Sequence, residues 1–330
     1  MRDKFALLLL LLVLGGIDLS LGRFQFSPVA LWEILWQGPA GEMWVLVVDL
    51  RLPRVMLAVG AGLALGLSGA LCQSLFRNPL AAPEMLGVTA GASLGAVLVI
   101  LAGAQGLAVT LGAGLGALGA TAALIALAGA AAGVNRLILT GVGVSLSLGG
   151  LSGLLIAQAD DRLAGDAILW MTGSLNGSYW GRTALVWVIV LPLWLCAEAG
   201  RRSLLRLELG DDLARSLGLG VRRARMWLLL VAACSVAAAV AVVGPVGFVG
   251  LMAAPFARAL AQILETQRTG PDLAGAAFAG AVIMVIADLM VLGVAPYALM
   301  PIGVFTGVLG APLLLALVLR GARKEVGVWG

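Results

Sequence analysis

Residues 55–76 read VMLAVGAGLALGLSGALCQSLF and lie between Arg54 and Arg77 without a single charged side chain. A helix needs about 20 predominantly apolar residues to cross the hydrocarbon core of a bilayer. The stretch therefore predicts a membrane-spanning helix with an arginine at each end.

The rest of the chain repeats this pattern. Of its 330 residues, 61% are hydrophobic and 12% are charged, whereas about 25% are charged in a typical soluble domain. Four further stretches contain no Asp, Glu, Lys or Arg: 85–135, 137–159, 226–257 and 289–319. With the sparsely charged segments 5–21, 183–200 and 272–292, they predict about ten membrane helices. We expect an all-α integral membrane protein with a single domain over 1–330.

Proline and glycine predict breaks in several of these helices. Gly244-Pro245-Val246-Gly247 interrupts the stretch 226–257, because proline cannot continue a regular helix without losing a hydrogen bond. A short helix from about 247 to 263 should follow. A second break is expected from Pro296 to Pro301, and Pro312 should kink the last span.

The basic residues predict the orientation of the chain. With ten spans and an inner N-terminus, sixteen of the 21 Lys and Arg residues fall on the inner side and five on the outer side. This asymmetry is what the positive-inside rule expects, and it places both termini in the cytoplasm. The net charge of +4 thus reflects membrane topology, and it does not indicate binding to nucleic acid.

Residue types that are rare or missing exclude several kinds of chemistry. The chain has no histidine, so it cannot supply a His-based triad or a His-rich metal site. Its only lysines, Lys4 and Lys324, lie outside any G-x-x-x-x-G-K-[ST] motif, so the chain has no P-loop for ATP. No group of side chains predicts an enzyme.

The inner connection at 201–225 contains a second local pattern. Residues 210–220 read GDDLARSLGLG, with acidic residues where a helix begins and glycines where it ends. Three arginines follow, at 222, 223 and 225. The segment is either a linker with a basic membrane anchor or a short helix presented to a cytosolic partner, and composition alone does not separate the two.

Several blocks of sequence resemble one known family over essentially the whole chain. In order, they are RLPR at 51–54, GALCQ at 69–73 with NPLAAP at 78–83, LGV at 86–88 with Gly91-Ala92, LTGV at 139–142, WMTGSL at 170–175, ARSLG at 214–218, GPVGFVGL at 244–251, PIGV at 301–304 and GAP at 310–312. Together they are similar to the FecCD-like (type II) permeases of ABC importers for iron-siderophores, haem and cobalamin.

The resemblance implies a complex in the bacterial inner membrane. Its parts would be two permease subunits, two cytosolic ATPase subunits that hold ATP and Mg²⁺, and an outer substrate-binding protein, either periplasmic or lipid-anchored. This chain would be a multi-pass permease without a cofactor of its own. The expected substrate is a ferric-siderophore or related iron chelate, with haem and cobalamin as alternatives. The second permease could be the same chain or a homologue.

The resemblance also implies roles for individual residues at the membrane surfaces. Arg51 and Arg54 would dock acidic side chains of the binding protein, although arginines at an interface can also simply extend towards water. Asn78, Leu80 and Asn135 would lie at the cytoplasmic gate. Asn78 could equally be a turn residue before Pro79.

The same resemblance assigns the short inner helix to coupling with the ATPase. The expected coupling residues are Asp211, Asp212, Leu213, Ala214, Arg215, Leu217 and Gly218. A short helix tied rigidly to two spans can transmit a rigid-body motion from the ATPase to the pathway. This favours the partner-binding interpretation of 201–225.

One alternative function belongs to another class. An acidic residue within a span can mark an ion-coupled secondary transporter, and Asp288 is the one candidate well inside a predicted span. A lone aspartate there can also cap or hydrogen-bond a neighbouring helix.

Overall fold

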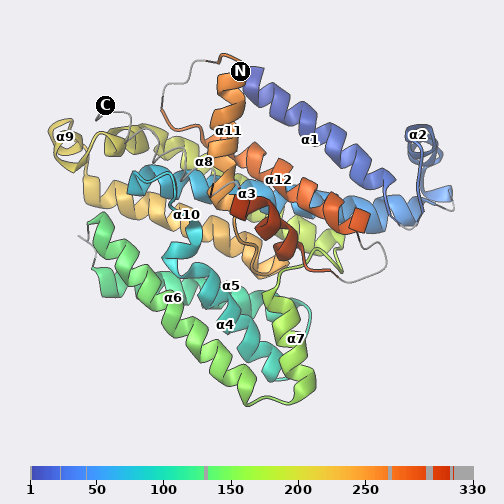
Figure 1. Cartoon of the computed structure of the whole chain (residues 1–330), viewed down its shortest axis with the longest axis horizontal. Helices are drawn as coiled ribbons and strands as arrows, with labels where there is room; N and C mark the ends of the chain where they lie inside the picture. Colours follow the sequence, from blue (N-terminus) through green and yellow to red (C-terminus); the bar gives the residue numbers. More distant parts are fainter. Residues whose placement is uncertain are drawn as a thin grey trace.

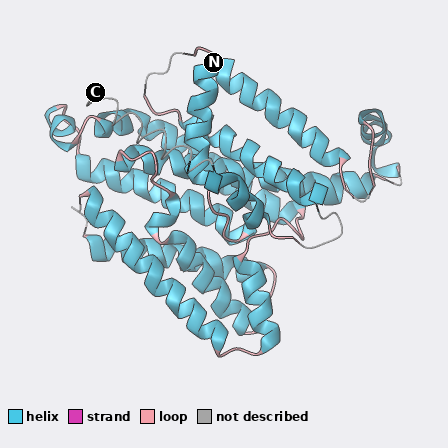
Figure 2. Ribbon diagram, viewed as in Figure 1, coloured by secondary structure: helices cyan, strands magenta, loops and turns pink. Residues whose placement is uncertain are grey.

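The computed structural model is built from helices, and no β-strand occurs among the residues that it describes (Figures 1 and 2). It describes the chain except residues 1, 23, 42, 130–132, 267–269, 295–299, 313–314 and 316–330. The helices are α1 (Arg2–Ser20), α2 (Pro28–Gln37), η1 (Gly38–Ala40), η2 (Val45–Arg51), α3 (Leu52–Phe76), η3 (Pro83–Leu86), α4 (Val88–Leu101), α5 (Leu107–Ala128), α6 (Val134–Ala157), α7 (Asp161–Met171), α8 (Trp180–Glu208), α9 (Asp211–Ser216), α10 (Val221–Val243), α11 (Val249–Ile263) and α12 (Leu273–Val294). An unlabelled helix covers Ile302–Pro312.

Each predicted membrane segment corresponds to a helix. Six helical segments are long and apolar enough to cross a membrane by length and composition: Val45–Phe76, Leu107–Ala128, Val134–Ala157, Trp180–Glu208, Val221–Val243 and Leu273–Val294. The other four segments correspond to α1, α4, α11 and Ile302–Pro312. The all-α membrane fold is confirmed. The end of the molecule that carries α9 is called the inner end and the opposite end the outer end, in keeping with the charge asymmetry.

Helix α3, which contains the charge-free stretch 55–76, forms the centre of the molecule (Figure 1). Of the most apolar part of Val45–Phe76, 89% is buried by other helices, and α3 packs against α8, α10, α11 and α12. Gly62 and Gly66 lie directly against the backbone of α12, and Gly69 lies against that of Gly250 in α11. A Cβ atom at any of the three would overlap backbone atoms, so small residues here set how closely the helices approach.

A second glycine contact joins α4 and α5. Gly91 and Gly95 of α4 face Gly116 and Gly112 of α5, each glycine lying against the backbone carbonyl of its counterpart. The four-residue spacing in the sequence therefore marks a real surface of contact, because residues four apart share a helix face.

The break at Pro245 lies where the sequence predicts it. Helix α10 ends at Val243 and α11 begins at Val249, and Gly244 between them has a φ of 80°, which glycine adopts at no steric cost. Of the other predicted breaks, the one from Pro296 to Pro301 falls mostly on residues outside the described part. The kink at Pro312 would also involve residues outside it.

Besides the predicted spans and α9, the described residues contain five further helical elements. Four lie on the outer side, α2, η1, η2 and α7, and η3 lies on the inner side. Ser27 begins α2, accepting a hydrogen bond from the Ala30 N–H at 3.1 Å, and η2 is a π-helix that continues directly into α3. Helix α7 buries Ala167 and packs against α4 and α6. Short amphipathic helices give a weak sequence signal because they need only one buried face.

Candidate functional site

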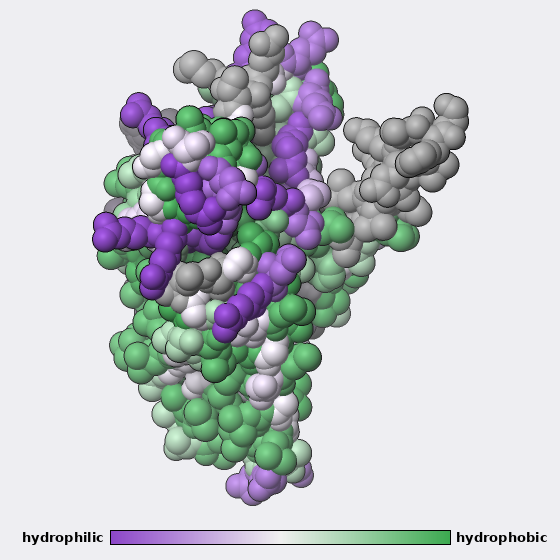
Figure 3. All heavy atoms as spheres, turned by 90° about the vertical axis from the view of Figure 1, so that its left-hand side faces the viewer, coloured by the Kyte–Doolittle hydropathy of each residue, from purple (hydrophilic) through white to green (hydrophobic). Residues whose placement is uncertain are grey.

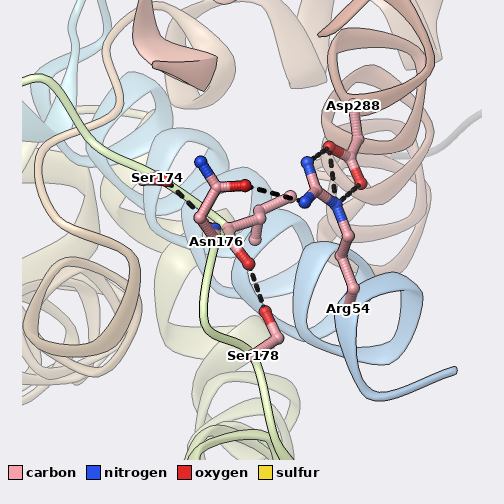
Figure 4. Close-up of polar contacts among 6 residues, drawn as sticks. Arg54, Ser174, Asn176, Ser178 and Asp288 are labelled. Atoms are coloured by element: carbon pink, nitrogen blue, oxygen red, sulfur yellow. Dashed lines mark hydrogen bonds and ion pairs between the residues drawn. The ribbon is translucent and has the colours of Figure 1, made fainter. Parts of the chain in front are cut away.

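A buried ion pair lies near the outer end of α3 (Figure 4). The Arg54 guanidinium donates to both carboxylate oxygens of Asp288 in α12, with Nη2–Oδ1 at 2.6 Å and Nε–Oδ2 at 2.9 Å. Its Nη1 also donates to Oδ1 of Asn176 at 2.9 Å. The Asp288 side chain is completely buried, and that of Arg54 is 19% exposed. This cluster, Arg54–Asn176–Asp288, is called the outer clamp; it joins α3, α12 and the segment after α7.

Arg51 is held differently from Arg54. It donates to the backbone carbonyls of Leu19 at 2.7 Å and Phe24 at 2.6 Å, and its guanidinium lies 4.9 Å from the ring centre of Phe26. Backbone carbonyls do not neutralise its charge as the Asp288 carboxylate does for Arg54. Of the two arginines expected to dock a binding protein, Arg51 therefore keeps more of its positive charge available at the outer surface.

Next to the outer clamp, three of the family-like sequence blocks meet. The Ser174 N–H donates to the Val243 carbonyl at 2.7 Å, and the Ile302 N–H donates to the Gly173 carbonyl at 3.1 Å. Gly173 lies against the carbonyl of Pro245. Backbone N–H and C=O groups that lie outside a helix at membrane depth need hydrogen-bond partners from neighbouring protein. The three segments provide such partners for one another.

The residues expected at the cytoplasmic gate lie at the inner end. The Asn78 Oδ1 accepts from the Leu80 N–H at 2.9 Å, which closes the turn after α3. The alternative role of Asn78 as a turn residue is thus present in the structure. Asn135 lies exposed in the first turn of α6, and α6 packs against η3, a few residues after that turn. The three residues share the inner end, but within the described part of the chain no side-chain hydrogen bond joins Asn135 to Asn78 or Leu80.

The predicted coupling segment forms a separate short helix, α9, as expected. Leu213 and Leu217 are 49% and 50% exposed, whereas Ala214 is buried. Gly218 ends the segment with a φ of 77°. The two leucines are thus apolar side chains exposed on an inner surface that is otherwise rich in charge.

Asp211 fixes α9 to the rest of the molecule. Its Oδ1 accepts from Arg225 Nη2 of α10 at 2.5 Å and lies 4.0 Å from Arg77 Nη2 at the end of α3, while Arg215 Nη2 lies 3.9 Å from Oδ2. The hydrogen bond from Arg225 and the surrounding positive charge hold the pKa of the Asp211 carboxyl below its ordinary value, against the opposing effect of burial. Asp212, by contrast, pairs only with Arg215 among the described residues, at 2.7 Å.

The site thus includes residues that the sequence did not single out. Asn176, Arg77 and Arg225 all bind a predicted residue directly. A signal existed for Asp288, because an acidic residue inside a span needs a partner. There was no comparable indication for Asn176, because asparagine is common in turns and connections for several structural reasons.

Comparisons with known proteins agree with this architecture. A family model described as the FecCD transport family matches residues 8–320. The hemin transport system permease protein HmuU of Yersinia pestis is 35% identical over 99% of this chain and 98% of its own length. The ferric enterobactin transport system permease protein FepG of Escherichia coli K12 is 37% identical over 95% and 94%, respectively.

A solved structure agrees as well. A metal-chelate type ABC transporter in an inward-facing conformation superposes with a TM-score of 0.84 at 28% identity, covering 97% of this chain and 99% of that one. The likeness extends over nearly all of both chains, so it includes the broken helices and both ends of the molecule. This chain belongs to the FecCD transport family of ABC importer permeases.

Proposed function

We propose that the chain is the membrane permease of a binding-protein-dependent importer for a ferric-siderophore or related iron chelate. The names of the relatives from Yersinia pestis and Escherichia coli refer to hemin and to ferric enterobactin. This supports iron chelates as the substrate class. ATP and Mg²⁺ would be bound by separate cytosolic subunits, and a second permease copy or homologue would complete the pathway. The chain would lie in the bacterial inner membrane with both termini in the cytoplasm.

The observation that carries this proposal is α9. This helix has six residues and exposes Leu213 and Leu217, and Asp211 anchors it to both α3 and α10. It is therefore suited to transmit the motion of a partner protein to the membrane helices. A partner that moves this helix would move two long spans with it. Asp211 to Gly218, including Asp212 and Arg215, is accordingly proposed as the contact with the ATPase.

On the outer side, we propose that Arg51 contributes to docking an acidic surface of the binding protein. Its guanidinium has the fixed charge and fork geometry that carboxylates require. The hydrogen bonds of Arg54 are already directed to Asp288 and Asn176. Arg54 would therefore contribute mainly by fixing α3, α12 and the segment after α7 to one another through the outer clamp. Asn78, Leu80 and Asn135 are proposed as the inner gate on the strength of their shared location.

Secondary transport through Asp288 is the less favoured function. An acidic residue that carries a coupling ion has to exchange it with water, and the Asp288 side chain is fully buried against Arg54 at 2.6 Å. The carboxylate therefore already has its counter-ion within the chain.

Transport assays in reconstituted vesicles test the proposal. The permease is assembled with its ATPase subunits and supplied with a binding protein loaded with radioactive ferric-siderophore. Uptake should require ATP on the ATPase side and should continue when the proton gradient is collapsed. Uptake that follows the proton gradient and ignores ATP would contradict the proposal.

A further inference from the structure

A cavity of about 630 Å³ lies beside α9 at the inner end of the molecule. The start of α10, α9 itself and the start of α6 form its walls. Its charged lining residues are Asp211, Arg215, Arg222, Arg223 and Arg225, and its apolar ones include Leu137, Met226 and Leu229. Four arginines face one aspartate, so the cavity is strongly positive.

Arg225 lies at the base of this cavity with donor capacity to spare. The residue is 8% exposed, and its Nη2 is bound to Asp211. Its Nε is buried without a hydrogen-bond partner among the described residues. A buried donor left unsatisfied costs free energy comparable to a lost hydrogen bond. This Nε has less than 1 Å² of accessible surface, so an anion in the cavity would interact with the positive charge of Arg225 and not with the Nε atom itself.

The first turn of α10 adds backbone donors to the same wall. Within the described part of the chain, the N–H groups of Arg222 and Arg223 have no backbone acceptor, as is usual in the first turn of a helix. A helix of 23 residues also carries a partial positive charge at this end. The arginine side chains and these N–H groups thus all favour an anion.

The surface beyond the cavity is apolar. Arg223, Trp227 and Leu230 follow one another at helical spacing along α10, and Trp227 and Leu230 are 49% and 37% exposed. Figure 3 views the molecule from the α9 side, the inner end; hydrophilic side chains gather in its upper half, and its lower half, where α5 and α6 lie in Figure 1, is mainly hydrophobic. A cationic site that continues into exposed apolar side chains of the same helix, Trp227 and Leu230, matches a molecule with an anionic head and hydrocarbon tails.

We propose that this cavity binds the phosphate group of an anionic phospholipid from the cytoplasmic leaflet. The phosphodiester contacts Arg222 and Arg223 and lies close to the positive charge of Arg225, and an acyl chain follows Trp227 and Leu230. Basic pockets at the cytoplasmic ends of membrane helices are suited to such headgroups. Because Arg225 also binds Asp211 of α9, the lipid would lie directly beside the helix proposed to contact the ATPase.

Lipid titrations of the purified full chain, followed by native mass spectrometry, test this proposal. Phosphatidylglycerol should bind at one site at least about tenfold more tightly than phosphatidylcholine, which lacks a net charge. The double substitution Arg222→Gln with Arg223→Gln should weaken phosphatidylglycerol about thirtyfold, or about fivefold per arginine near the membrane surface. The charge-preserving pair Arg222→Lys with Arg223→Lys should bind within about threefold of the wild type.

A matched control separates this site from general surface charge. Arg202 and Arg206 are exposed at the inner end of α8 and do not line the cavity; changing both to Gln removes the same charge. Equal losses in the two double Gln variants would overturn the proposal, as would equal binding of the two lipids.

Two further outcomes identify other occupants. If millimolar inorganic phosphate displaces the lipid completely, the site is one for a free anion. If the Arg222→Gln, Arg223→Gln variant releases the ATPase subunits while phosphatidylglycerol binding is unchanged, the arginines serve the ATPase. Either result overturns the lipid proposal without affecting the proposed import function, which the vesicle assay tests separately.

Discussion

The outer clamp predicts that its two charged partners are unequally important for stability. Arg54→Gln removes the counter-ion of a carboxylate that is completely buried, whereas Asp288→Asn leaves behind an arginine whose side chain is 19% exposed. Arg54 would still bind Asn176 and could extend towards water at the outer surface. Asp18, also buried, lies within electrostatic range of Asp288 and of Arg54, so loss of Arg54 would remove a positive charge that both acidic groups share.

The expected free-energy changes follow from these differences. Removing one member of a buried ion pair costs about 3–5 kcal/mol when the remaining charge is trapped, which applies to Arg54→Gln. Loss of hydrogen bonds to a group that can reach water costs less, about 1–3 kcal/mol, which applies to Asp288→Asn. The double variant removes both charges, so its cost should fall below the sum of the two single costs by at least about 1.5 kcal/mol.

Reversible unfolding in mixed detergent–SDS micelles measures these changes, with the nine tryptophans as the fluorescent probe. The three variants and the wild type form a double-mutant cycle, so no single value has to be interpreted alone. Additive effects within about 0.5 kcal/mol, or a larger cost for Asp288→Asn than for Arg54→Gln, would refute the reasoning. A matching loss of uptake in Arg54→Gln would show that the outer surface depends on the clamp.

Three further predictions concern other parts of the molecule. Leu217→Asp, which places a charge on the exposed face of α9, should reduce co-purification of the ATPase at least about tenfold, whereas Ile263→Asp at another exposed inner position should not. The native pKa of Asp211 is depressed, so its contribution to holding α9 is present above about pH 4 and is lost only on further acidification. The amount of ATPase that co-purifies with the permease should therefore stay constant from about pH 5 to 8. A decline within that range would contradict the assignment. Gly69→Val should destabilise the fold by at least about 1–3 kcal/mol through overlap with α11, while Gly119→Val, with no atom within 4 Å of the added carbon, should have little effect on thermal unfolding.

The parts of this fold that the sequence predicts are those with local causes. The charge-free stretch 55–76, the break at Pro245 and the acidic start of α9 each depend on a few neighbouring residues, and each is present in the structure. Helix α7 was missed for the opposite reason. It packs against α4, which is distant in sequence, and against the neighbouring α6, and buries only Ala167, so its pattern does not differ clearly from that of a loop.

The outer clamp shows why contacts between distant residues were harder to predict. Arg54 and Asp288 are 234 residues apart, and each by itself allowed two interpretations. Their pairing depends on how far α3 and α12 slide along each other, which is set by Gly62 and Gly66 against the α12 backbone. The four-residue spacing of Gly62 and Gly66 puts both on one face of α3, but it does not identify the helix that packs there or its register.

Helix α3 connects the two regions to which function is assigned. At its outer end Arg54 binds Asp288 and Asn176, and just beyond its inner end Arg77 faces Asp211 of α9. A helix of 25 residues is about 37 Å long, and α3 is packed tightly on nearly all sides, so it can bend little. A displacement of α9 at the inner end is therefore expected to shift the clamp at the outer end along with it. In this way, the same glycine-rich segment that defines the membrane fold would also carry the motion of an ATPase to the surface that we propose for docking of a binding protein.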